Sequence, residues 1–394
     1  MKLPAVHSVE REILSFFADR NFERSRRFSP GAYNPEFLRR FLKALGNPQL
    51  RYRTLHIAGT VGKGSTTTYL SRALSALGFR TGAYLSPHFV SLRERITIDG
   101  APIPGEDLGQ LWQFMMRKTD LADLSFFDAM TAMAFLYYAE RKCHWAVIEV
   151  GLGGRLDSTN NLQAQAAIIT RIDYDHRAIL GNTLAAIAQE KAGIIRPGQN
   201  VYTLPQPEEA MNVVREVAGK SGAQLNVLLP RGETFSETNL DFALQIIARE
   251  TGIGPDIQQS LLHAIDQPVF GRWTLIQQAP QVFFDGAHNV AGISALAALV
   301  NRQPEAECNF FLNTMKERNL NEFVELLRQQ VKKKVNVWLF PVNDPLYHDT
   351  TTAALPAADD QTIAQTLTHE GALHIFTGSM SLYAELKRRF SRTL

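Results

Sequence analysis

The sequence predicts an α/β protein with two domains, each built on a mostly parallel sheet. Along the first two-thirds of the chain, short apolar runs rich in β-forming residues alternate with longer amphipathic segments. The runs are almost continuously apolar, which is typical of parallel strands covered by helices on both faces. The same alternation starts again after residues 266–268. At 394 residues, the chain is long enough for two or three domains whose cores need no metal or disulfide.

The first part of the chain contains four clear strand patterns and three helix patterns. The expected strands cover residues 55–58, 82–85, 146–150 and 166–172. The expected helices cover residues 65–77, 130–141 and 183–192. Gly193 and Pro197 follow the last of these helices and are typical of a helix end.

The second part repeats the pattern on a smaller scale. Strands are expected at residues 282–285, 309–312, 335–340 and 373–376. Helices are expected at residues 291–300 and 320–331, with a last helix at the C-terminal end. The segment 268–271 separates the two patterns, so the predicted domains are residues 1–267 and 268–394.

Composition and charge exclude several classes of protein. The 41 Lys and Arg residues are nearly balanced by 39 Asp and Glu residues, so no charge excess would attract nucleic acid or an anionic membrane. Two distant cysteines, Cys143 and Cys308, indicate a reducing compartment without disulfides, and we expect the cytoplasm. The N-terminus lacks the apolar core of a signal peptide, and no apolar run reaches the ~18 residues of a membrane span.

The strongest functional signal is the segment 58–66, AGTVGKGST, between a predicted strand and a predicted helix. Its small residues allow successive backbone N–H groups to point at one anion, and the helix N-terminus adds partial positive charge. Lys63 can reach terminal phosphates, and the hydroxyl of Ser65 or Thr66 can bind Mg²⁺. This pattern predicts a phosphate-binding loop, although Gly64 separates the lysine from the hydroxyl. The alternative is a tightly packed turn.

Polar residues that follow other predicted strands indicate a metal ion at the same sheet edge. Glu149 stands near the end of an apolar strand, where ligands of open α/β sheets collect, and its carboxylate could hold the magnesium ion of a nucleotide. His176 and Ser86 each follow another strand and could complete the metal shell. The alternatives are a solvated glutamate at a strand end and an ordinary loop histidine.

Lys191 occupies an unusual position for a charged side chain. It shares one face of a predicted helix with Leu184 and Ile187, so its stem lies on the apolar stripe. The amine could extend to solvent near the helix C-terminus. Otherwise, burial would keep part of the amine neutral and reactive, for example towards CO₂, which would give an anionic carbamate.

The second domain contains an Arg and an Asp that could act on a nucleotide. Asp285 ends a predicted strand shortly before His288 and Asn289, and Arg272 lies upstream. A guanidinium can stabilise a transferring phosphate, and a carboxylate can bind the ribose or base. The alternative is an Arg–Asp pair that only stabilises the domain.

Together, these segments resemble the folylpolyglutamate synthase/dihydrofolate synthase family of Mur-type ligases. The segments GTVGKGST, LSPHFVSLRERI, EVGLGGRLDSTN, LGNTLAAIAQEKAGIIRPG, FGRW and DGAHN occur in the family's order, and the resemblance covers most of the chain. It implies an N-terminal P-loop ATPase domain, a smaller Rossmann-like C-terminal domain and an active site between them. It also implies that MgATP phosphorylates the carboxylate of a folate or pteroate and that L-glutamate then attacks the acyl phosphate.

The resemblance further implies roles for individual residues. The residues that would bind ATP are Gly59, Thr60, Gly62, Lys63, Gly64, Ser65, Thr66, Arg272, Asp285 and Asn289. Those that would bind two magnesium ions are Ser65, Ser86, Glu149 and His176. Those that would contact the pterin ring are Ser125, Phe126, Phe127, Asp128, Leu156, Asp157 and Ser158. Lys63, a carbamylated Lys191 and His288 would take part in catalysis, in a protein that the family suggests is a monomer.

Three departures from the family pattern bear on activity. Val61 replaces a frequent Asn, Asp128 replaces a frequent Glu, and residues 315–318 replace a segment that usually carries Lys-Asp. The readings that remain open are a Mur-type ligase with another acceptor, a P-loop kinase or simple NTPase, and a non-catalytic nucleotide-binding homologue. A kinase or NTPase would leave the second domain and Lys191 unexplained.

Overall fold

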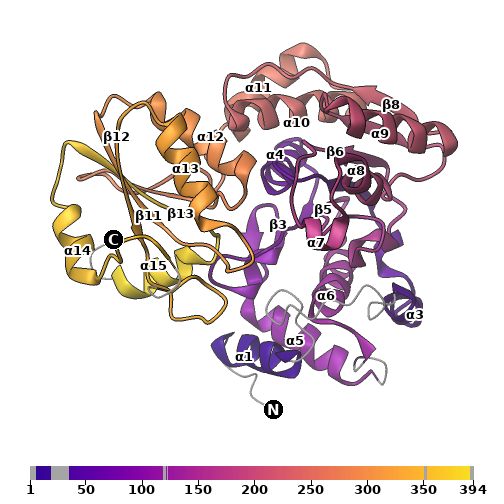
Figure 1. Cartoon of the computed structure of the whole chain (residues 1–394). Coiled ribbons are helices and arrows are strands. Elements are labelled where there is room, and N and C mark those ends of the chain that lie inside the picture. Colours follow the sequence, from indigo (N-terminus) through magenta and orange to yellow (C-terminus); the bar gives the residue numbers. More distant parts are fainter. Residues whose placement is uncertain (1–5, 19–34, 119–120, 122, 350–352, 391–394) are drawn as a thin grey trace. The chain divides into compact units, whose positions relative to one another are not determined.

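The computed structural model describes residues 6–18, 35–118, 121, 123–349 and 353–390, and the chain divides into two compact units, residues 1–266 and 267–394 (Figure 1). Every helix among these residues is too short or too polar to cross a lipid bilayer.

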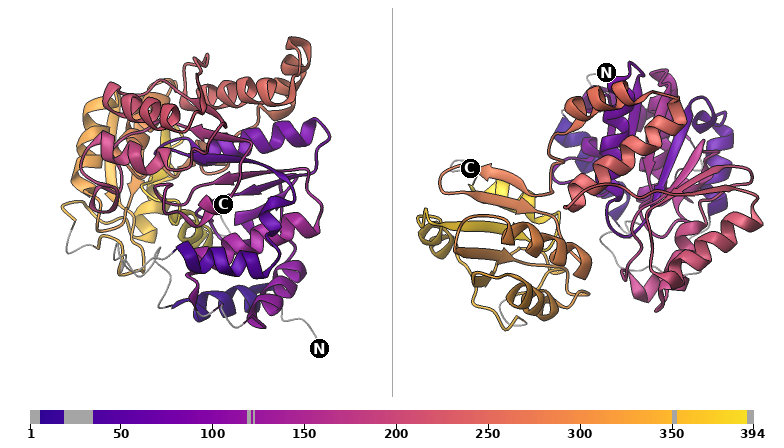
Figure 2. Two further views of the ribbon diagram at one scale, coloured as in Figure 1. Left: turned by 90° about the vertical axis from the view of Figure 1, so that its right-hand side faces the viewer. Right: turned by 90° about the horizontal axis from the view of Figure 1, so that it is seen from above.

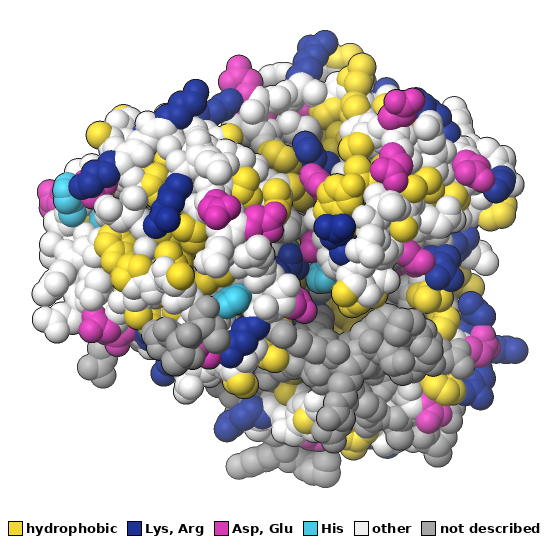
Figure 3. Space-filling view, in the orientation of Figure 1, with side chains coloured by type: hydrophobic (Ala, Val, Ile, Leu, Met, Phe, Trp, Pro, Cys, Tyr) yellow, Lys and Arg dark blue, Asp and Glu magenta, His cyan; other side chains and the backbone are white. Residues whose placement is uncertain are grey.

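On the face drawn in Figure 3, Lys and Arg side chains lie among Asp and Glu side chains and form no continuous region of one sign.

The first unit contains an eight-stranded sheet and its covering helices. In chain order, its elements are α1 (Val6–Phe16), α3 (Pro35–Ala44), η2 (Pro48–Leu50), β1 (Arg53–Ala58), α4 (Lys63–Ala76), β2 (Thr81–Tyr84), η3 (Leu92–Arg95), β3 (Ile96–Ile98), β4 (Ala101–Pro102), α5 (Gly105–Met116), α6 (Phe126–Glu140), β5 (Trp145–Glu149), η5 (Ser158–Asn161), β6 (Ala166–Ile169), α7 (Arg177–Leu180), α8 (Leu184–Ala192), β7 (Asn200–Thr203), α9 (Glu208–Lys220), β8 (Gln224–Val227), α10 (Phe235–Thr251) and α11 (Pro255–Ile265).

The strands of this sheet have the order β4-β3-β2-β5-β1-β6-β7-β8. All neighbours from β2 to β8 run parallel, whereas β3 and β4 are antiparallel additions at one edge. The mostly parallel sheet predicted from the sequence is therefore confirmed. Because β5, β1 and β6 are adjacent and parallel, their C-terminal ends meet at one edge, and the loops that follow them lie together.

Helices cover both faces of the sheet, as Figures 1 and 2 show. Helix α4 packs on β1, β2 and β5, and α10 and α11 pack on α4. On the opposite face, Tyr138 of α6 lies against Gly82 of β2 and its hydroxyl donates to the Ala83 carbonyl at 2.7 Å. This double cover explains why β5 is buried at every position and why its sequence is almost wholly apolar.

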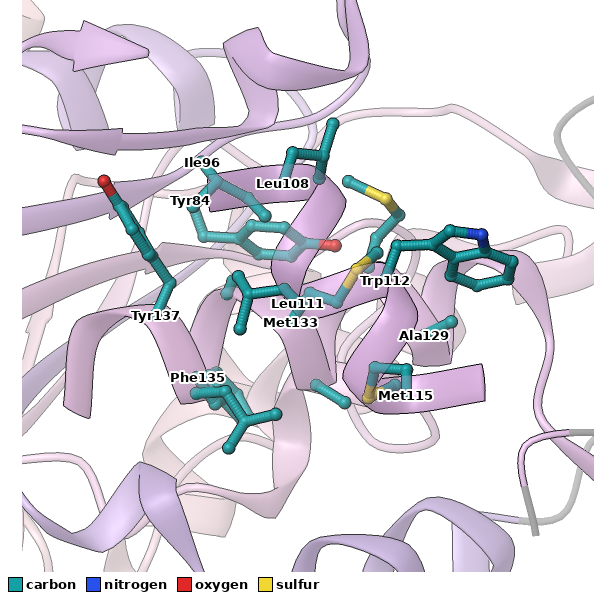
Figure 4. Close-up of a cluster of buried hydrophobic side chains, with 14 of the residues drawn as sticks. Tyr84, Ile96, Leu108, Leu111, Trp112, Met115, Ala129, Met133, Phe135 and Tyr137 are labelled. Atoms are coloured by element: carbon teal, nitrogen blue, oxygen red, sulfur yellow. The ribbon is translucent and has the colours of Figure 1, made fainter. Parts of the chain in front are cut away.

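A large hydrophobic core fixes α6 against α5 and the sheet (Figure 4). Tyr84 of β2, Trp112 of α5 and Met133 of α6 are each at most 1% exposed within it. Burying a side chain of this size contributes about 1.5–3 kcal/mol to folding. The packing matters for the site because the N-terminus of α6 carries the predicted pterin-binding residues from Ser125 onwards.

The second unit is a smaller α/β unit. Its elements are β9 (Thr274–Gln277), β10 (Val282–Asp285), α12 (Val290–Asn301), β11 (Glu307–Leu312), α13 (Leu320–Gln330), β12 (Lys334–Leu339), α14 (Asp360–Thr366), β13 (Ala372–Thr377) and α15 (Leu382–Phe390). The sheet order is β12-β11-β13-β10-β9, and only β9 is antiparallel to its neighbour. The predicted smaller, largely parallel α/β unit is confirmed.

Most predicted element boundaries shift slightly, and the two that shift furthest do so for identifiable reasons. The strand expected to reach residue 172 ends at Ile169, because the Arg171 carbonyl leaves the ladder to accept hydrogen bonds from the phosphate-binding loop. Helix α6 begins at Phe126, four residues before the predicted start, because Ser125 and Asp128 form a capping box. The short strands β3, β4, β7 and β8 and the helices α9 to α11 were not predicted.

Candidate active site

The loop between β1 and α4 has a backbone suited to binding phosphate. Gly59 and Gly62 adopt φ values of 151° and 94°. A Cβ at Gly59 would lie 1.8 Å from the Thr170 hydroxyl, and one at Gly62 would lie 2.7 Å from the Asn239 amide oxygen. Both positions therefore require glycine. Gly62 is also the N-cap of α4 and supplies no side-chain cap, so the helix terminus remains suited to an anion.

Hydrogen bonds of Thr60 in this loop and of Thr66 in the first turn of α4 hold the loop in shape. The Thr60 N–H donates to the Arg171 carbonyl at 2.8 Å, and its hydroxyl donates to the Asp173 carbonyl at 2.9 Å. Thr66 is fully buried in α4, where its N–H donates to the Gly62 carbonyl. The N–H and hydroxyl donors of Thr60 are therefore engaged within the protein, whereas the buried Thr66 hydroxyl has no hydrogen-bond partner among the described residues. The predicted contacts of Thr60 and Thr66 with ATP remain predictions.

Lys63 and Lys191 converge on one backbone carbonyl. The Nζ atoms donate to the Gly59 carbonyl at 3.1 Å from Lys63 and 2.9 Å from Lys191. Lys191 is 3% exposed, so its amine does not extend to solvent. Burial lowers the pKa of Lys191 to about 7, and the neighbouring Lys63 adds to this shift. A substantial fraction of Lys191 is therefore a neutral amine near pH 7.

Glu149 and Ser86 lie together at the C-terminal ends of β5 and β2. The Ser86 N–H donates to a Glu149 carboxylate oxygen at 3.0 Å. That carboxylate oxygen lies 3.6 Å from the position of a Cβ on Gly64, so Glu149 faces the first turn of α4, which also carries the buried Ser65. Carboxylate and hydroxyl oxygens are ligands that Mg²⁺ prefers, with water and phosphate completing its shell. The donors present therefore fit Mg²⁺.

The structure does not gather a complete metal cage from protein side chains. Among the described residues, no group of three or more His, Cys, Asp or Glu side chains is placed to hold a metal ion. His176 precedes α7 with a left-handed φ of 46°, and its Nε2 lies 3.8 Å from an Asp175 carboxylate oxygen. A residue other than glycine pays about 1–2 kcal/mol for this conformation. A role of His176 at the metal thus remains a prediction.

The two segments predicted to contact the pterin touch each other. The Ser158 hydroxyl donates to Asp128 at 2.7 Å, and the Ser125 hydroxyl donates to the other oxygen of the same carboxylate at 2.7 Å. The ring of Phe127 lies 5.7 Å from the Tyr84 ring and is half-buried beside Gly151, where an added Cβ would come within 2.6 Å of it. These residues form one surface near the C-terminal ends of β2 and β5.

Within these segments, the residues differ in accessibility. Phe126 is 1% exposed and packs in the core under the Arg95 guanidinium, 5.3 Å from the ring centroid, so its ring is not accessible to a ligand in this structure. A contact of Phe126 with the pterin remains a prediction. Leu156 is partly exposed. Asp157 is buried, and burial raises its pKa to about 6.

A cavity of about 360 Å³ beside the phosphate-binding loop was not predicted from the sequence. Val61, Leu204, Phe235 and Asn239 are among its lining residues. Asn239 on α10 is buried and contacts the loop at Gly62, as the Cβ position above shows. The capping box of Thr234 and Glu237 could have located the start of α10, but no sequence signal places that helix beside the loop.

In the second unit, Asp285 is held by backbone donors. One of its carboxylate oxygens accepts the Trp273 N–H at 2.8 Å, and the other accepts the Ala287 N–H at 2.9 Å. Burial raises the pKa of Asp285, and the nearby charge of Arg272 opposes this shift. The Arg272 guanidinium donates to the Gly271 carbonyl at 3.2 Å. Among the described residues, the two side chains do not form an ion pair, so the alternative of a stabilising Arg–Asp bridge is not supported.

His288 and Asn289 follow Asp285 directly. The His288 Nδ1 lies 2.8 Å from the Gly286 carbonyl, which assigns the ring proton to Nδ1 in the neutral imidazole. Asn289 is buried and caps α12, where its side-chain oxygen accepts the Gly292 N–H at 2.8 Å. The four predicted residues of the second unit therefore gather at the C-terminal end of β10.

Comparison with known proteins gives a consistent result. The family model for the Mur ligase middle domain matches residues 57–228. A dihydrofolate synthase/folylpolyglutamate synthase of Bacillus subtilis is 33% identical over 338 residues, which cover 75% of this chain and 75% of that protein. A folylpolyglutamate synthase of Mycobacterium tuberculosis, solved with ADP and AMPPCP, superposes with a TM-score of 0.85 at 25% identity, covering 98% of this chain and 99% of that one.

A second solved structure is similar over the same length. It is an FPGS complex with AMPPCP and folate, with a TM-score of 0.79 at 26% identity, and the match covers 97% of this chain and 99% of that one. The likeness to both structures therefore includes the two units of this chain.

Proposed function

Because the chain belongs to the dihydrofolate synthase/folylpolyglutamate synthase family of Mur-type ligases, we propose that it adds L-glutamate to a folate at the expense of ATP, with dihydropteroate as a second acceptor. One observation carries this proposal. The uncapped N-terminus of α4, Lys63 and the Glu149 carboxylate lie at the same sheet edge as the joined segments 125–128 and 156–158. A phosphate site and an acceptor site on one edge suit a reaction that phosphorylates the acceptor.

The chemistry requires activation of a carboxylate. An amide does not form from a carboxylate in water without a better leaving group than hydroxide, and phosphorylation of the acceptor supplies one. The N-terminus of α4 and Lys63 would bind the ATP phosphates and stabilise the charge that develops during transfer. Magnesium ions held by Ser65, Ser86, Glu149 and His176 would neutralise further phosphate charge.

The arrangement of the two lysines supports a carbamate on Lys191. Two ammonium groups that share the Gly59 carbonyl repel each other, and burial already favours the neutral amine. The neutral nitrogen can form a bond to CO₂ and lose a proton, which gives a carboxylate-like group on a long stem. That anion would attract Lys63 and would help to orient the phosphorylated acceptor.

The cavity beside the loop suits the base of ATP. Val61 and Phe235 provide apolar walls, and the buried Asn239 amide can both donate and accept hydrogen bonds at the edge of a purine. In this arrangement Val61, which replaces a frequent Asn, would pack against the base. The predicted contacts of Arg272, Asp285, His288 and Asn289 with ATP and the reacting groups are part of the same proposal.

We further propose that the enzyme is a cytoplasmic monomer that handles small molecules. Its two cysteines are both buried and free, which suits a reducing compartment.

One assay separates this proposal from its rivals. The full chain is incubated with MgATP, isotope-labelled L-glutamate and either tetrahydrofolate or dihydropteroate, and the products are resolved by mass. We expect a product longer by one glutamate residue, with one ADP and one phosphate released for each amide formed. Phosphate release that needs neither glutamate nor a folate would indicate a simple NTPase. ATP binding without turnover on any acceptor would indicate a non-catalytic homologue.

A further inference from the structure

A chain of buried polar groups ties the predicted pterin segment to the centre of β1. The His56 Nε2 lies 2.8 Å from the Thr159 hydroxyl, although the two residues are 103 positions apart. The same hydroxyl donates to an Asp157 carboxylate oxygen at 2.6 Å. His56 is 1% exposed, Thr159 is not exposed and Asp157 is 7% exposed. These hydrogen bonds therefore connect His56, on the strand that leads into the phosphate-binding loop, to the predicted substrate residue Asp157.

The donors and acceptors of the three side chains determine the direction of each hydrogen bond. An ionised carboxylate only accepts, so the single proton of the Thr159 hydroxyl points to Asp157. The hydroxyl oxygen must then accept from His56, which places the imidazole proton on Nε2. Burial lowers the pKa of His56 to about 3, with a contribution from Arg196, so the ring stays neutral and keeps this tautomer.

These hydrogen bonds also determine which oxygen of the Asp157 carboxylate can accept a further hydrogen bond. One oxygen accepts both the Thr159 hydroxyl at 2.6 Å and the Thr159 N–H at 3.0 Å, which fills its two lone pairs. The other oxygen accepts the Leu152 N–H at 2.9 Å and retains one lone pair. The second oxygen can therefore accept one further N–H group, from a direction that these hydrogen bonds fix.

An apolar residue at position 56 would serve the fold without this arrangement. Strand β1 is buried on both faces, and an imidazole there costs free energy unless its polar atoms are paired. Its partner, the buried Thr159, directly follows the predicted substrate segment 156–158 and also binds Asp157 of that segment. This pairing is the observation that separates a positioning role from an ordinary satisfied core histidine.

We propose that His56 and Thr159 are positioning residues that hold the Asp157 carboxylate in place to accept an N–H donor from the fused heterocyclic ring of the acceptor substrate. The inference rests on the proposed function, because it takes the acceptor to be a folate. It predicts that breaking the hydrogen bonds between His56, Thr159 and Asp157 weakens folate binding and leaves ATP binding largely unchanged.

The charges around Asp157 set its expected pH response. Burial and Asp128 on α6 raise the pKa of Asp157, whereas the Thr159 hydroxyl, the Thr159 N–H and the Leu152 N–H lower it. Lys191 on α8, whose own pKa is about 7, is the neighbouring amine. Loss of the Thr159 hydroxyl removes a bond that favours the carboxylate. The pKa of Asp157 then rises above its present value of about 6, and folate binding should fail at a higher pH.

The test compares Thr159→Val, which keeps the side-chain shape, with Thr159→Ser, which keeps the hydroxyl. For the full chain, tetrahydrofolate binding is measured by calorimetry from pH 5 to 8, together with KM for tetrahydrofolate and for ATP. We expect Thr159→Val to weaken tetrahydrofolate binding by about tenfold, with KM for ATP changed by less than about twofold, and to move the pH midpoint upwards. Thr159→Ser should bind within about threefold of the wild type.

His56 provides a second pair of variants if Thr159→Val does not fold. His56→Gln keeps a donor near the Nε2 position and should retain most of the affinity for tetrahydrofolate, whereas His56→Leu should weaken it by about three- to tenfold. Equal losses for tetrahydrofolate and ATP, or wild-type affinity and an unchanged pH midpoint in Thr159→Val, would overturn the inference. A wild-type chain that ligates another acceptor but does not bind folates would instead overturn the proposed function.

Discussion

Each unit contains a strand that leads through a polar loop into a helix, and the two helices begin differently. Helix α4 follows Gly62, which has a left-handed conformation and no side chain to cap the helix. Helix α12 follows Asn289, whose side-chain oxygen accepts the Gly292 N–H at 2.8 Å. The first helix terminus is therefore suited to an external anion, whereas the second is satisfied by its own residue.

The comparison shows how one supersecondary unit can serve two purposes. In the first unit, the backbone and the helix terminus would bind phosphate, and Lys63 and Glu149 add charge beside them. In the second unit, one backbone N–H group binds each oxygen of Asp285, and Arg272 is the cation beside this carboxylate. We therefore expect the largest losses of activity from changes in the first unit.

Lys63→Ala should have the largest effect. Removing this cation beside the α4 terminus should lower kcat by about 10³-fold or more, because the second amine at the Gly59 carbonyl, Lys191, has a pKa of about 7 and cannot replace its fixed charge. Steady-state ligation assays would measure this loss, with Lys220→Ala, an exposed lysine on α9, as the control. Near-normal turnover at saturating MgATP would place the phosphate site elsewhere.

Glu149→Gln should lower kcat by about 10²- to 10³-fold and raise the magnesium concentration needed for half-maximal rate. The amide keeps the shape of the side chain and its hydrogen bond from Ser86, so folding should change little. The measurement is a magnesium titration of initial rates with ATP held constant. An unchanged magnesium requirement would remove Glu149 from the metal site.

Lys191→Ala should lower kcat by about 10²-fold, and added acetate should restore part of the activity by replacing the carbamate. Lys191→Arg should be inactive and should not respond to acetate. Because the pKa of Lys191 is about 7 and only the neutral amine reacts with CO₂, wild-type activity at a fixed low CO₂ concentration should rise as the pH passes upwards through 7. A rate that is independent of CO₂ would argue against the carbamate.

Arg272→Ala should have a smaller effect, about tenfold on kcat, with ATP affinity changed by less than about threefold. Arg272 belongs to the second unit, whereas the phosphate-binding loop belongs to the first, so ATP should still bind without this guanidinium. Nucleotide affinity from calorimetry and kcat from ligation assays give the two values. Equal losses in both would make Arg272 part of the resting ATP site.

Asn289→Ala should have the smallest effect of these substitutions, and we expect it in the stability of the second unit. Loss of the α12 cap should cost about 1 kcal/mol, whereas Asn289→Gly, which makes α12 begin as α4 does, should cost only a few tenths. Urea unfolding followed by circular dichroism would give both free energies. Equal costs for Ala and Gly would mean that Asn289 stabilises the unit through something other than the cap.

Local patterns predicted much of this molecule. Continuous apolar runs predicted the parallel sheets, glycines and a lysine between a strand and a helix predicted the phosphate-binding loop, and helical spacing placed Lys191 on an apolar face. Each of these depends on residues a few positions apart. Boundaries were less accurate where a distant residue intervened, as when Arg171 leaves β6 to hold Thr60 and Val61.

The sequence by itself therefore determined the α/β class, the phosphate-binding loop and the family, because periodicity and turn chemistry act over short stretches of chain. Only the tertiary structure decided that Phe127 rather than Phe126 is accessible, that Asn239 lies beside Gly62, and that His56 meets Thr159 across 103 positions. These contacts depend on how helices and strands pack, and packing joins residues whose separation in the sequence carries no periodic signal.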